Sequence, residues 1–166
     1  MTIGILQVFT IGHSDHPMAE LIQLLNRHKV TLVIDVRSQP YSQWVPQHNR
    51  ESLSRSLQSA GIRYLYMGDS LGGRPTDRSL YEGDDEVPDY DLVAKSPVYL
   101  AGIDKLLRLA SAQRVAVMCS EGDHTKCHRW HLITPTLLEH GARVLHIRPD
   151  STVVEEQPQP KQLTLF

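Results

Sequence analysis

Short apolar runs alternate along the chain with longer segments whose apolar residues recur at helical spacing. An apolar run of about four to eight residues between turn residues is typical of a buried strand. Apolar residues three and four positions apart predict an amphipathic helix, as with Leu21, Leu24 and Leu25 in the first of the longer segments. The pattern predicts strands at residues 8–11, 31–34, 62–67, 114–118 and 143–147, with helices at residues 17–28, 49–61, 96–110 and 130–141.

The strict alternation of predicted strands and helices indicates the fold class. A helix between two strands returns the chain to the start of the next parallel strand, and successive helices can cover both faces of the sheet. We therefore expect residues 1–149 to form a single three-layer α/β domain with a mostly parallel, five-stranded sheet, of Rossmann-like or rhodanese-like architecture. Residues 76–95 are acidic and rich in turn residues, and they are expected to form a lid or surface loop.

Four polar motifs follow the predicted strands, and they contain residues that turns do not require. The carboxyl ends of parallel strands share one edge of the sheet, where ligands bind, so we expect these motifs to converge on one site. The alternative is that they only form turns and helix caps. Arg, His and Cys are not turn residues, which favours a site. The motifs are Gly12-His13-Ser14, Asp35-Val36-Arg37, Leu71-Gly72-Gly73-Arg74 and Cys119-Ser120-Glu121.

Several arginines lie near the carboxyl edge of the predicted sheet, and they indicate an anion-binding site. A guanidinium binds phosphate or carboxylate through two parallel hydrogen bonds. The alternative is that an arginine pairs with Asp35 or Glu121 inside the protein. The residues predicted to contact an anion are Arg37, Arg74 and Arg129, with Ser14, Gly72 and Gly73 at the same strand ends.

The candidates for a reacting centre lie at the same strand ends. Cys119 ends a predicted strand, and a helix N-terminus or Arg129 nearby would lower the pKa of its thiol and make it a nucleophile. The alternative is that Cys119 packs as a small buried side chain. Glu121 and Asp35 are the carboxylates available for acid–base chemistry, and His13 is the best-placed imidazole.

A metal centre is the competing interpretation of the residues around Cys119. His128 and His131 are one helical turn apart, which permits metal binding without requiring it. The spacing of the potential ligands fits none of the familiar zinc motifs, and there is no second cysteine pair. No metal or other cofactor is therefore predicted. The residues considered for zinc are Cys119, His124, Cys127, His128 and His131.

Taken together, these motifs resemble the DUF488 family of bacterial and archaeal proteins. The resemblance implies a fold and a site but no reaction, because the activity of the family is not established. The family usually has Pro-x-Ser-Arg after the Asp-Val-Arg motif, whereas this chain has Gln43 in place of that arginine. The matching motifs are Thr10-Ile-Gly-His-Ser14, Asp35-Val-Arg37 with Pro40, Gly61-Ile-Arg-Tyr64, Leu71-Gly-Gly-Arg74, Met118-Cys-Ser-Glu121, Cys127-His-Arg129 and Val144-Leu-His-Ile147.

A second similarity, to rhodanese-like sulfurtransferases and cysteine phosphatases, is limited. Those enzymes hold a cysteine and an arginine on one tight loop above a helix N-terminus. Here Cys119 and Arg129 are too far apart in the sequence for such a loop, and Cys127 lies between them.

Charge and hydropathy restrict the partners. The formal net charge of −2 excludes a broadly basic surface for nucleic acid, so an anion site must be local. The first ten residues lack the features of a signal peptide, and no apolar run approaches the roughly 18 residues of a membrane helix. Two cysteines do not form a disulfide framework, so we expect a protein of the reducing cytoplasm without membrane contacts.

The C-terminal tail, residues 150–166, changes in character. Its proline, glutamine and acidic residues predict a flexible linker. The last five residues read Gln162-Leu163-Thr164-Leu165-Phe166 and resemble the Gln-Leu-Ser/Asp-Leu-Phe motif by which bacterial polymerases and repair proteins bind the DNA sliding clamp. Gln162, Leu163, Leu165 and Phe166 are the predicted clamp contacts. The alternative is that the tail folds back on its own domain.

The sequence leaves three functional hypotheses. The first is an enzyme of DNA repair or replication that acts on a phosphate-bearing substrate, nucleic acid or nucleotide, and is recruited by the sliding clamp. The second is a non-catalytic adaptor that binds a nucleotide or nucleic acid. The third is a thiol or sulfur-transfer enzyme that acts independently of DNA.

Overall fold

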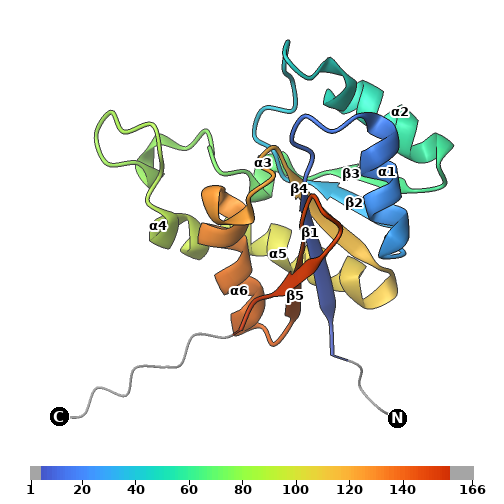
Figure 1. Ribbon diagram of the computed structural model, residues 1–166. Coiled ribbons are helices and arrows are strands. Elements are labelled where there is room, and N and C mark those ends of the chain that lie inside the picture. Colours follow the sequence, from blue (N-terminus) through green and yellow to red (C-terminus); the bar gives the residue numbers. More distant parts are fainter. Residues whose placement is uncertain (1–4, 158–166) are drawn as a thin grey trace.

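The computed structural model describes residues 5–157. Strands and helices alternate along the chain, as the sequence pattern predicts (Figure 1). The strands are β1 (Gln7–Gly12), β2 (Leu32–Asp35), β3 (Arg63–Tyr66), β4 (Val115–Cys119), β5 (Arg143–Ile147) and β6 (Val153–Glu155). The helices are α1 (Met18–Arg27), α2 (Arg50–Ser59), α3 (Gly68–Leu71), α4 (Tyr90–Lys95), α5 (Pro97–Ala112) and α6 (Thr134–Glu139). A π-helix (Arg129–Ile133) precedes α6, and 3₁₀ turns lie at Pro46–His48, Arg78–Leu80 and His124–Lys126.

The strands form one sheet in the order β3-β2-β4-β1-β5-β6. All pairs among the first five strands are parallel, and β6 is antiparallel to β5. This arrangement confirms the predicted α/β domain and its mostly parallel sheet, to which β6 adds a strand that the pattern did not predict.

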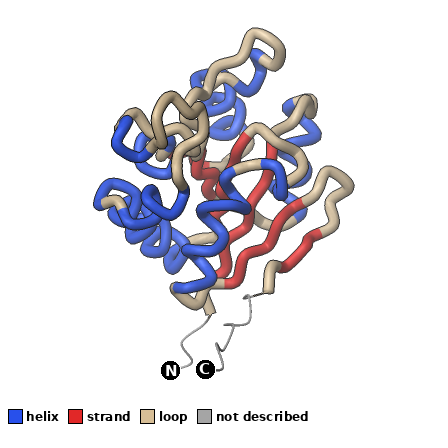
Figure 2. Tube along the Cα trace, turned by 90° about the vertical axis from the view of Figure 1, so that its left-hand side faces the viewer, coloured by secondary structure: helices blue, strands red, loops and turns tan. Residues whose placement is uncertain are grey.

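The helices cover both faces of the sheet and complete three layers. Figure 2 shows the strands side by side with helices on either side. On one face, apolar residues of α1 and α2, such as Leu25 and Leu57, pack against Val33. On the other face, α5 and α6 contribute Ile103 and Leu137. The chain moves toward β3 through α1 and α2 and back through α5 and α6, so right-handed crossovers place the two pairs of helices on opposite faces.

The acidic segment at residues 76–95 is partly ordered as a 3₁₀ turn and α4. The side chain of Asp89 caps α4 by accepting hydrogen bonds from the backbone N–H groups of Asp91 and Leu92. Val93 of α4 is buried in the core shared with α5, so the segment is anchored to the domain at this end. Among residues 5–157, none of the helices combines the length and the apolar character needed to cross a membrane.

The sheet continues past residue 149, where the sequence pattern placed the end of the domain. Strand β6 has only three residues and lies beside acidic residues, so the apolar pattern does not indicate a strand there. Residues from other elements stabilise β6. Arg143 of β5 donates to Glu155 through Nε at 2.6 Å and Nη2 at 2.8 Å. The indole of Trp130 donates to Glu156 at 2.9 Å. Residues up to Gln157 therefore belong to the described domain, and the predicted clamp motif lies outside the described residues.

Two truncated chains test whether the domain ends at residue 149, as the sequence pattern predicts, or extends to residue 157, as the structure shows. A chain ending at Pro149 should be less stable than a chain ending at Gln157, because it loses β6 and exposes the edge of β5. We expect the free energy of unfolding to differ by roughly 1–3 kcal/mol, from half-buried valines and lost hydrogen bonds. Urea denaturation of both truncations measures this difference. Equal midpoints and slopes would contradict a structural role for residues 150–157.

Candidate functional site

The carboxyl ends of β1, β2 and β4 meet where the fold changes direction. Strands β1 and β2 lead to helices on one face and β4 leads to the opposite face, which is where open α/β sheets bind ligands. Backbone hydrogen bonds continue past the strand ends: His13 N–H donates to the Cys119 carbonyl at 2.9 Å, and Ser14 N–H donates to the Ser120 carbonyl at 2.9 Å. Only glycine fits at position 12, because a Cβ there would lie 1.6 Å from the Glu121 carbonyl oxygen.

A pocket of about 330 Å³ lies at this edge. Three of the four predicted motifs contribute to it, through Arg37, through Gly73 and Arg74, and through Cys119 to Glu121. His13 and Ser14 do not line it. The other lining residues are Ser38, Gln39, Tyr90, Lys126, Cys127 and His128.

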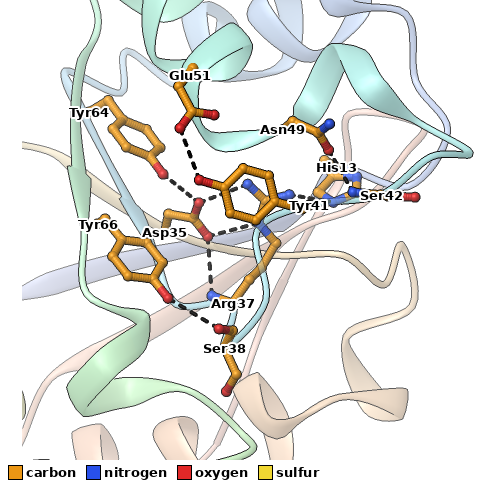
Figure 3. Close-up of polar contacts among 10 residues, drawn as sticks. All are labelled: His13, Asp35, Arg37, Ser38, Tyr41, Ser42, Asn49, Glu51, Tyr64 and Tyr66. Carbon is orange, nitrogen blue, oxygen red and sulfur yellow. Dashed lines mark hydrogen bonds and ion pairs between the residues drawn. The ribbon is translucent and has the colours of Figure 1, made fainter.

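Asp35 and Arg37 form a buried ion pair that Figure 3 shows in detail. Arg37 donates to the Asp35 carboxylate from Nε at 2.9 Å and from Nη2 at 2.8 Å. The Tyr64 hydroxyl donates to the same carboxylate at 2.6 Å, and burial together with this hydrogen bond raises the pKa of Tyr64. The pairing is the alternative considered from the sequence, and it leaves Arg37 with little capacity for an external anion.

His13 completes this network as a neutral imidazole. Its Nδ1–H donates to the Ser14 carbonyl at 2.7 Å, so Nε2 is free to accept from Arg37 Nη1 at 3.2 Å. Burial lowers the pKa of His13 to about 4, which keeps the ring uncharged at neutral pH. His13 and Asp35 were predicted as catalytic groups, and the structure places both in contacts that fix the position of Arg37.

Two cysteines face each other beside the pocket. Cys119 ends β4 and is buried, whereas Cys127 follows the 3₁₀ turn and is partly exposed. Their sulfur atoms are 2.9 Å apart. The sequence interpretation treated Cys127 only as a metal candidate. Its position two residues before Arg129, in the Cys127-His-Arg129 motif, was the available signal for a paired thiol and guanidinium.

Arg129 is fully buried and directs its guanidinium to Cys127. Its Nε–H donates to the Cys127 sulfur at 3.2 Å and its backbone N–H at 3.4 Å. The remaining donors bind Thr10 Oγ1 at 3.1 Å and the Glu121 carbonyl at 2.7 Å. Arg129 does not line the pocket, so its predicted contact with an anion is replaced in this structure by a contact with sulfur.

The two thiols differ in acidity because their surroundings differ. The hydrogen bond from Cys119 and the charge of Arg129 lower the pKa of Cys127 to about 6. Burial raises the pKa of Cys119 well above its ordinary value. These shifts favour a thiolate at Cys127 and a protonated thiol at Cys119 that donates to it. The sequence analysis considered Cys119 as a nucleophile or as a small buried side chain.

Arg74 and Lys126 are the exposed cations that line the pocket. The backbone N–H of Arg74 donates to Ser38 Oγ at 2.9 Å. Within residues 5–157, the guanidinium of Arg74 has no hydrogen-bond or ion-pair partner. Close packing sets the position of this residue, because a Cβ on Gly73 would lie 2.9 Å from the ring of His128. Of the three predicted arginines, Arg74 is the one available to a ligand.

Glu121, Ser14 and Gln43 differ in their relation to the pocket. Glu121 is exposed and lines it, so its carboxylate remains available as the acid–base group that the sequence predicted. The Ser14 hydroxyl donates to Asp15 at 3.4 Å. Gln43 is exposed and does not line the pocket, so this residue leaves no gap there where the family usually has arginine.

The chain belongs to the family described as "Domain of unknown function DUF488", whose model matches residues 17–134. The match includes the Asp35–Arg37 pair, Arg74 and both cysteines. No curated protein and no solved structure matches the chain.

The acidity of Cys127 can be measured by alkylation. The rate of modification of Cys127 by iodoacetamide should rise through a midpoint near pH 6 and level off by about pH 7.5, because the thiolate is the nucleophile. The Cys119→Ala variant removes the hydrogen bond to this sulfur and should move the midpoint upward. Peptide mass spectrometry identifies the modified residue. A rate that still rises tenfold per pH unit above pH 8, or preferential modification of Cys119, would contradict the assignment.

Proposed function

We propose that this protein is a thiol enzyme in which Cys127 attacks a sulfur atom of an anionic substrate and Cys119 resolves the product. The observation that carries the proposal is the 2.9 Å separation of the Cys119 and Cys127 sulfur atoms, together with the hydrogen bond that the buried guanidinium of Arg129 donates to Cys127. A structural pair of buried cysteines would need neither the arginine nor the pocket. Active-site thiols are commonly those with a lowered pKa and partial exposure, as at Cys127.

The proposed reaction is a two-step thiol–disulfide exchange. The Cys127 thiolate attacks one sulfur of a disulfide R–S–S–R′, forms a mixed disulfide and releases R′–S⁻. Cys119 then gives its proton to the released R′–S⁻ and attacks the Cys127 sulfur, which releases R–S⁻ and leaves a Cys119–Cys127 disulfide. The substrate gains two electrons, and the enzyme loses them. A low-molecular-weight thiol or a dithiol protein would restore the reduced pair.

The donors around Cys127 favour chemistry at sulfur over phosphoryl transfer. Transfer of a phosphoryl group to a cysteine requires several donors aimed at the phosphate oxygens. Here the Nε–H and backbone N–H of Arg129 are directed at the cysteine sulfur itself. Arg74 and Lys126 lie at the pocket and would bind a carboxylate or phosphate elsewhere on the substrate. Binding of a phosphate-bearing substrate thus remains compatible with the site, through these two cations.

Trapping of the mixed disulfide tests the proposed function. With the disulfide reagent 5,5′-dithiobis(2-nitrobenzoate), the wild-type protein should release two equivalents of the aromatic thiolate and acquire an internal disulfide. The Cys119→Ser variant should release one equivalent and retain the adduct on Cys127. The Cys127→Ser variant should react at least about tenfold more slowly, because the remaining thiol is buried and protonated.

Intact-protein mass spectrometry distinguishes these products, and circular dichroism verifies that each variant is folded. An Arg74→Ala variant should react normally with uncharged disulfides and more slowly with anionic ones. Stable double adducts on the wild-type protein, with no internal disulfide, would refute the resolving role of Cys119. Such a result would favour the non-catalytic adaptor of the sequence analysis.

We also propose, from the sequence of the tail, that Gln162–Phe166 recruits the domain to the DNA sliding clamp. The observation that favours this proposal is the match of four of the five residues to the clamp-binding motif. A tethered domain reaches an effective concentration of roughly millimolar through a short linker. That would place the pocket near nucleic acid although the full chain has a formal net charge of −2.

A peptide-deletion experiment tests recruitment. The full chain should bind purified bacterial sliding clamp, and deletion of Gln162–Phe166 should abolish binding, because Leu163, Leu165 and Phe166 supply the predicted apolar contacts. Replacement of Leu165 and Phe166 by alanine should weaken binding at least about 30-fold, the effect of losing roughly 2 kcal/mol. Surface plasmon resonance measures the affinity, and Lys161→Ala is the control. Equal binding by the full and deleted chains would exclude this role for the tail.

A further inference from the structure

Two histidines and a glutamate gather outside the pocket, on the far side of Thr10. His124 lies in the 3₁₀ turn after β4, His146 lies in β5 and Glu156 follows β6. Glu156 Oε1 is 3.5 Å from His146 Nε2 and 3.6 Å from His124 Nε2. One ligand atom from each residue lies within 4.8 Å of the other two, and no other group of this kind was found among residues 5–157.

His146 provides an independent observation that points to a ligand. Its side chain is 0% exposed, and its Nε2 has no hydrogen-bond partner. Its Nδ1 is only 2.6 Å from Thr10 Oγ1, which fixes the orientation of the ring. Buried polar atoms normally have a partner, so an unpartnered nitrogen that faces a carboxylate indicates a place for a cation.

We propose that His124, His146 and Glu156 bind one divalent transition-metal ion of the zinc class. Two imidazole nitrogens and one carboxylate oxygen suit zinc and its neighbours, whereas calcium and magnesium prefer oxygen ligands. Ligands about 2.0–2.1 Å from a tetrahedral metal lie roughly 3.4 Å from one another. The two separations from Glu156 Oε1, 3.5 and 3.6 Å, are close to this value.

The surroundings supply the support that metal ligands require. Thr10 Oγ1 contacts His146, and the Trp130 indole donates to Glu156 Oε1 at 2.9 Å, so two of the three ligands have a second partner that holds them. The rings of His124 and His146 are stacked with centroids 3.9 Å apart. Binding of one ion therefore requires the ring of His124 to tilt. This residue lies on a short turn and lines an open pocket, from which a water molecule could complete the coordination.

The proposed metal site is separate from the thiol pair. Neither cysteine belongs to the group of ligand atoms, and none of the three ligands lines the pocket beside Cys127. Arg129 is the cation between the two regions, where it contacts both Thr10 and the Cys127 sulfur.

Zinc binding to the full chain tests this proposal. Equilibrium dialysis against buffered Zn²⁺, with metal quantified by mass spectrometry, should give one ion per chain. The Glu156→Gln and His124→Ala variants should each bind at least about tenfold more weakly, because even the loss of an outer-shell partner of a ligand costs roughly 10–100-fold in metal affinity. His140→Ala is the matched control, because His140 is exposed and lies outside the group of ligands. The Glu156→Gln side chain can still accept from Trp130, so it removes the charge with little effect on folding.

A cysteine-free variant, with Cys119→Ser and Cys127→Ser, distinguishes this site from binding by thiolates. It should still bind one ion, and Co²⁺ bound to it should give the visible spectrum of a nitrogen and oxygen site. Zinc should also raise the melting temperature of the wild-type protein but not of Glu156→Gln. Failure of the wild-type protein to bind one ion, loss of binding in the cysteine-free variant, or unchanged binding by Glu156→Gln would each overturn the proposal.

Discussion

The buried guanidinium of Arg129 is the constraint on which both candidate sites depend. A charged side chain that is buried away from solvent needs compensating hydrogen bonds and a counter-charge. Arg129 bonds Thr10 of β1 and the Glu121 carbonyl after β4, which joins two strand ends. Among the described residues, no carboxylate forms an ion pair with it. Its remaining donors reach the sulfur of Cys127, so the thiolate supplies the negative charge that the buried cation requires.

A second buried arginine shows the contrasting arrangement. Arg37 is compensated by the carboxylate of Asp35, with Tyr64 and His13 completing the hydrogen bonds. This pair needs no further anion, and it holds the loop after β2 against the loop after β1. The two buried arginines at this sheet edge therefore have different partners. Arg37 binds the Asp35 carboxylate, and Arg129 donates hydrogen bonds to the Cys127 sulfur.

Most of the fold, and the sheet edge at which three of the four polar motifs meet, could be predicted from the sequence, because both follow from periodicity. Apolar runs between helical segments give β1 to β5, and parallel strands bring their polar ends together. Strand β6 could not be predicted, because it is stabilised by Arg143 and Trp130, which lie elsewhere in the sequence. The sequence likewise suggested that an arginine would pair with Asp35 but could not identify Arg37 as that residue.

The roles of the two cysteines could not be predicted for a related reason. Acidity depends on burial and on neighbours in space, and the sequence places Cys119 and Cys127 on the same short segment. Cys119 looked reactive because it ends a strand, yet that position buries it and raises the pKa of its thiol. His146 belongs to the Val144-Leu-His-Ile147 motif but was not considered as a metal ligand, because a histidine within an apolar strand is usually a satisfied core residue. Its unpartnered nitrogen is visible only once β6 brings Glu156 beside it.

The charge of Arg129 also affects the two halves of the proposed exchange in opposite ways. Formation of a Cys119–Cys127 disulfide consumes the thiolate and leaves the buried guanidinium without its counter-charge. The reduced pair is therefore stabilised relative to the disulfide, and a couple whose reduced form is stabilised is a stronger oxidant. The pair should therefore reduce only disulfides that are strong oxidants themselves, and once oxidised it would readily accept electrons from another thiol. This electrostatic asymmetry makes the pair better suited to repeated exchange than to serving as a permanent structural disulfide.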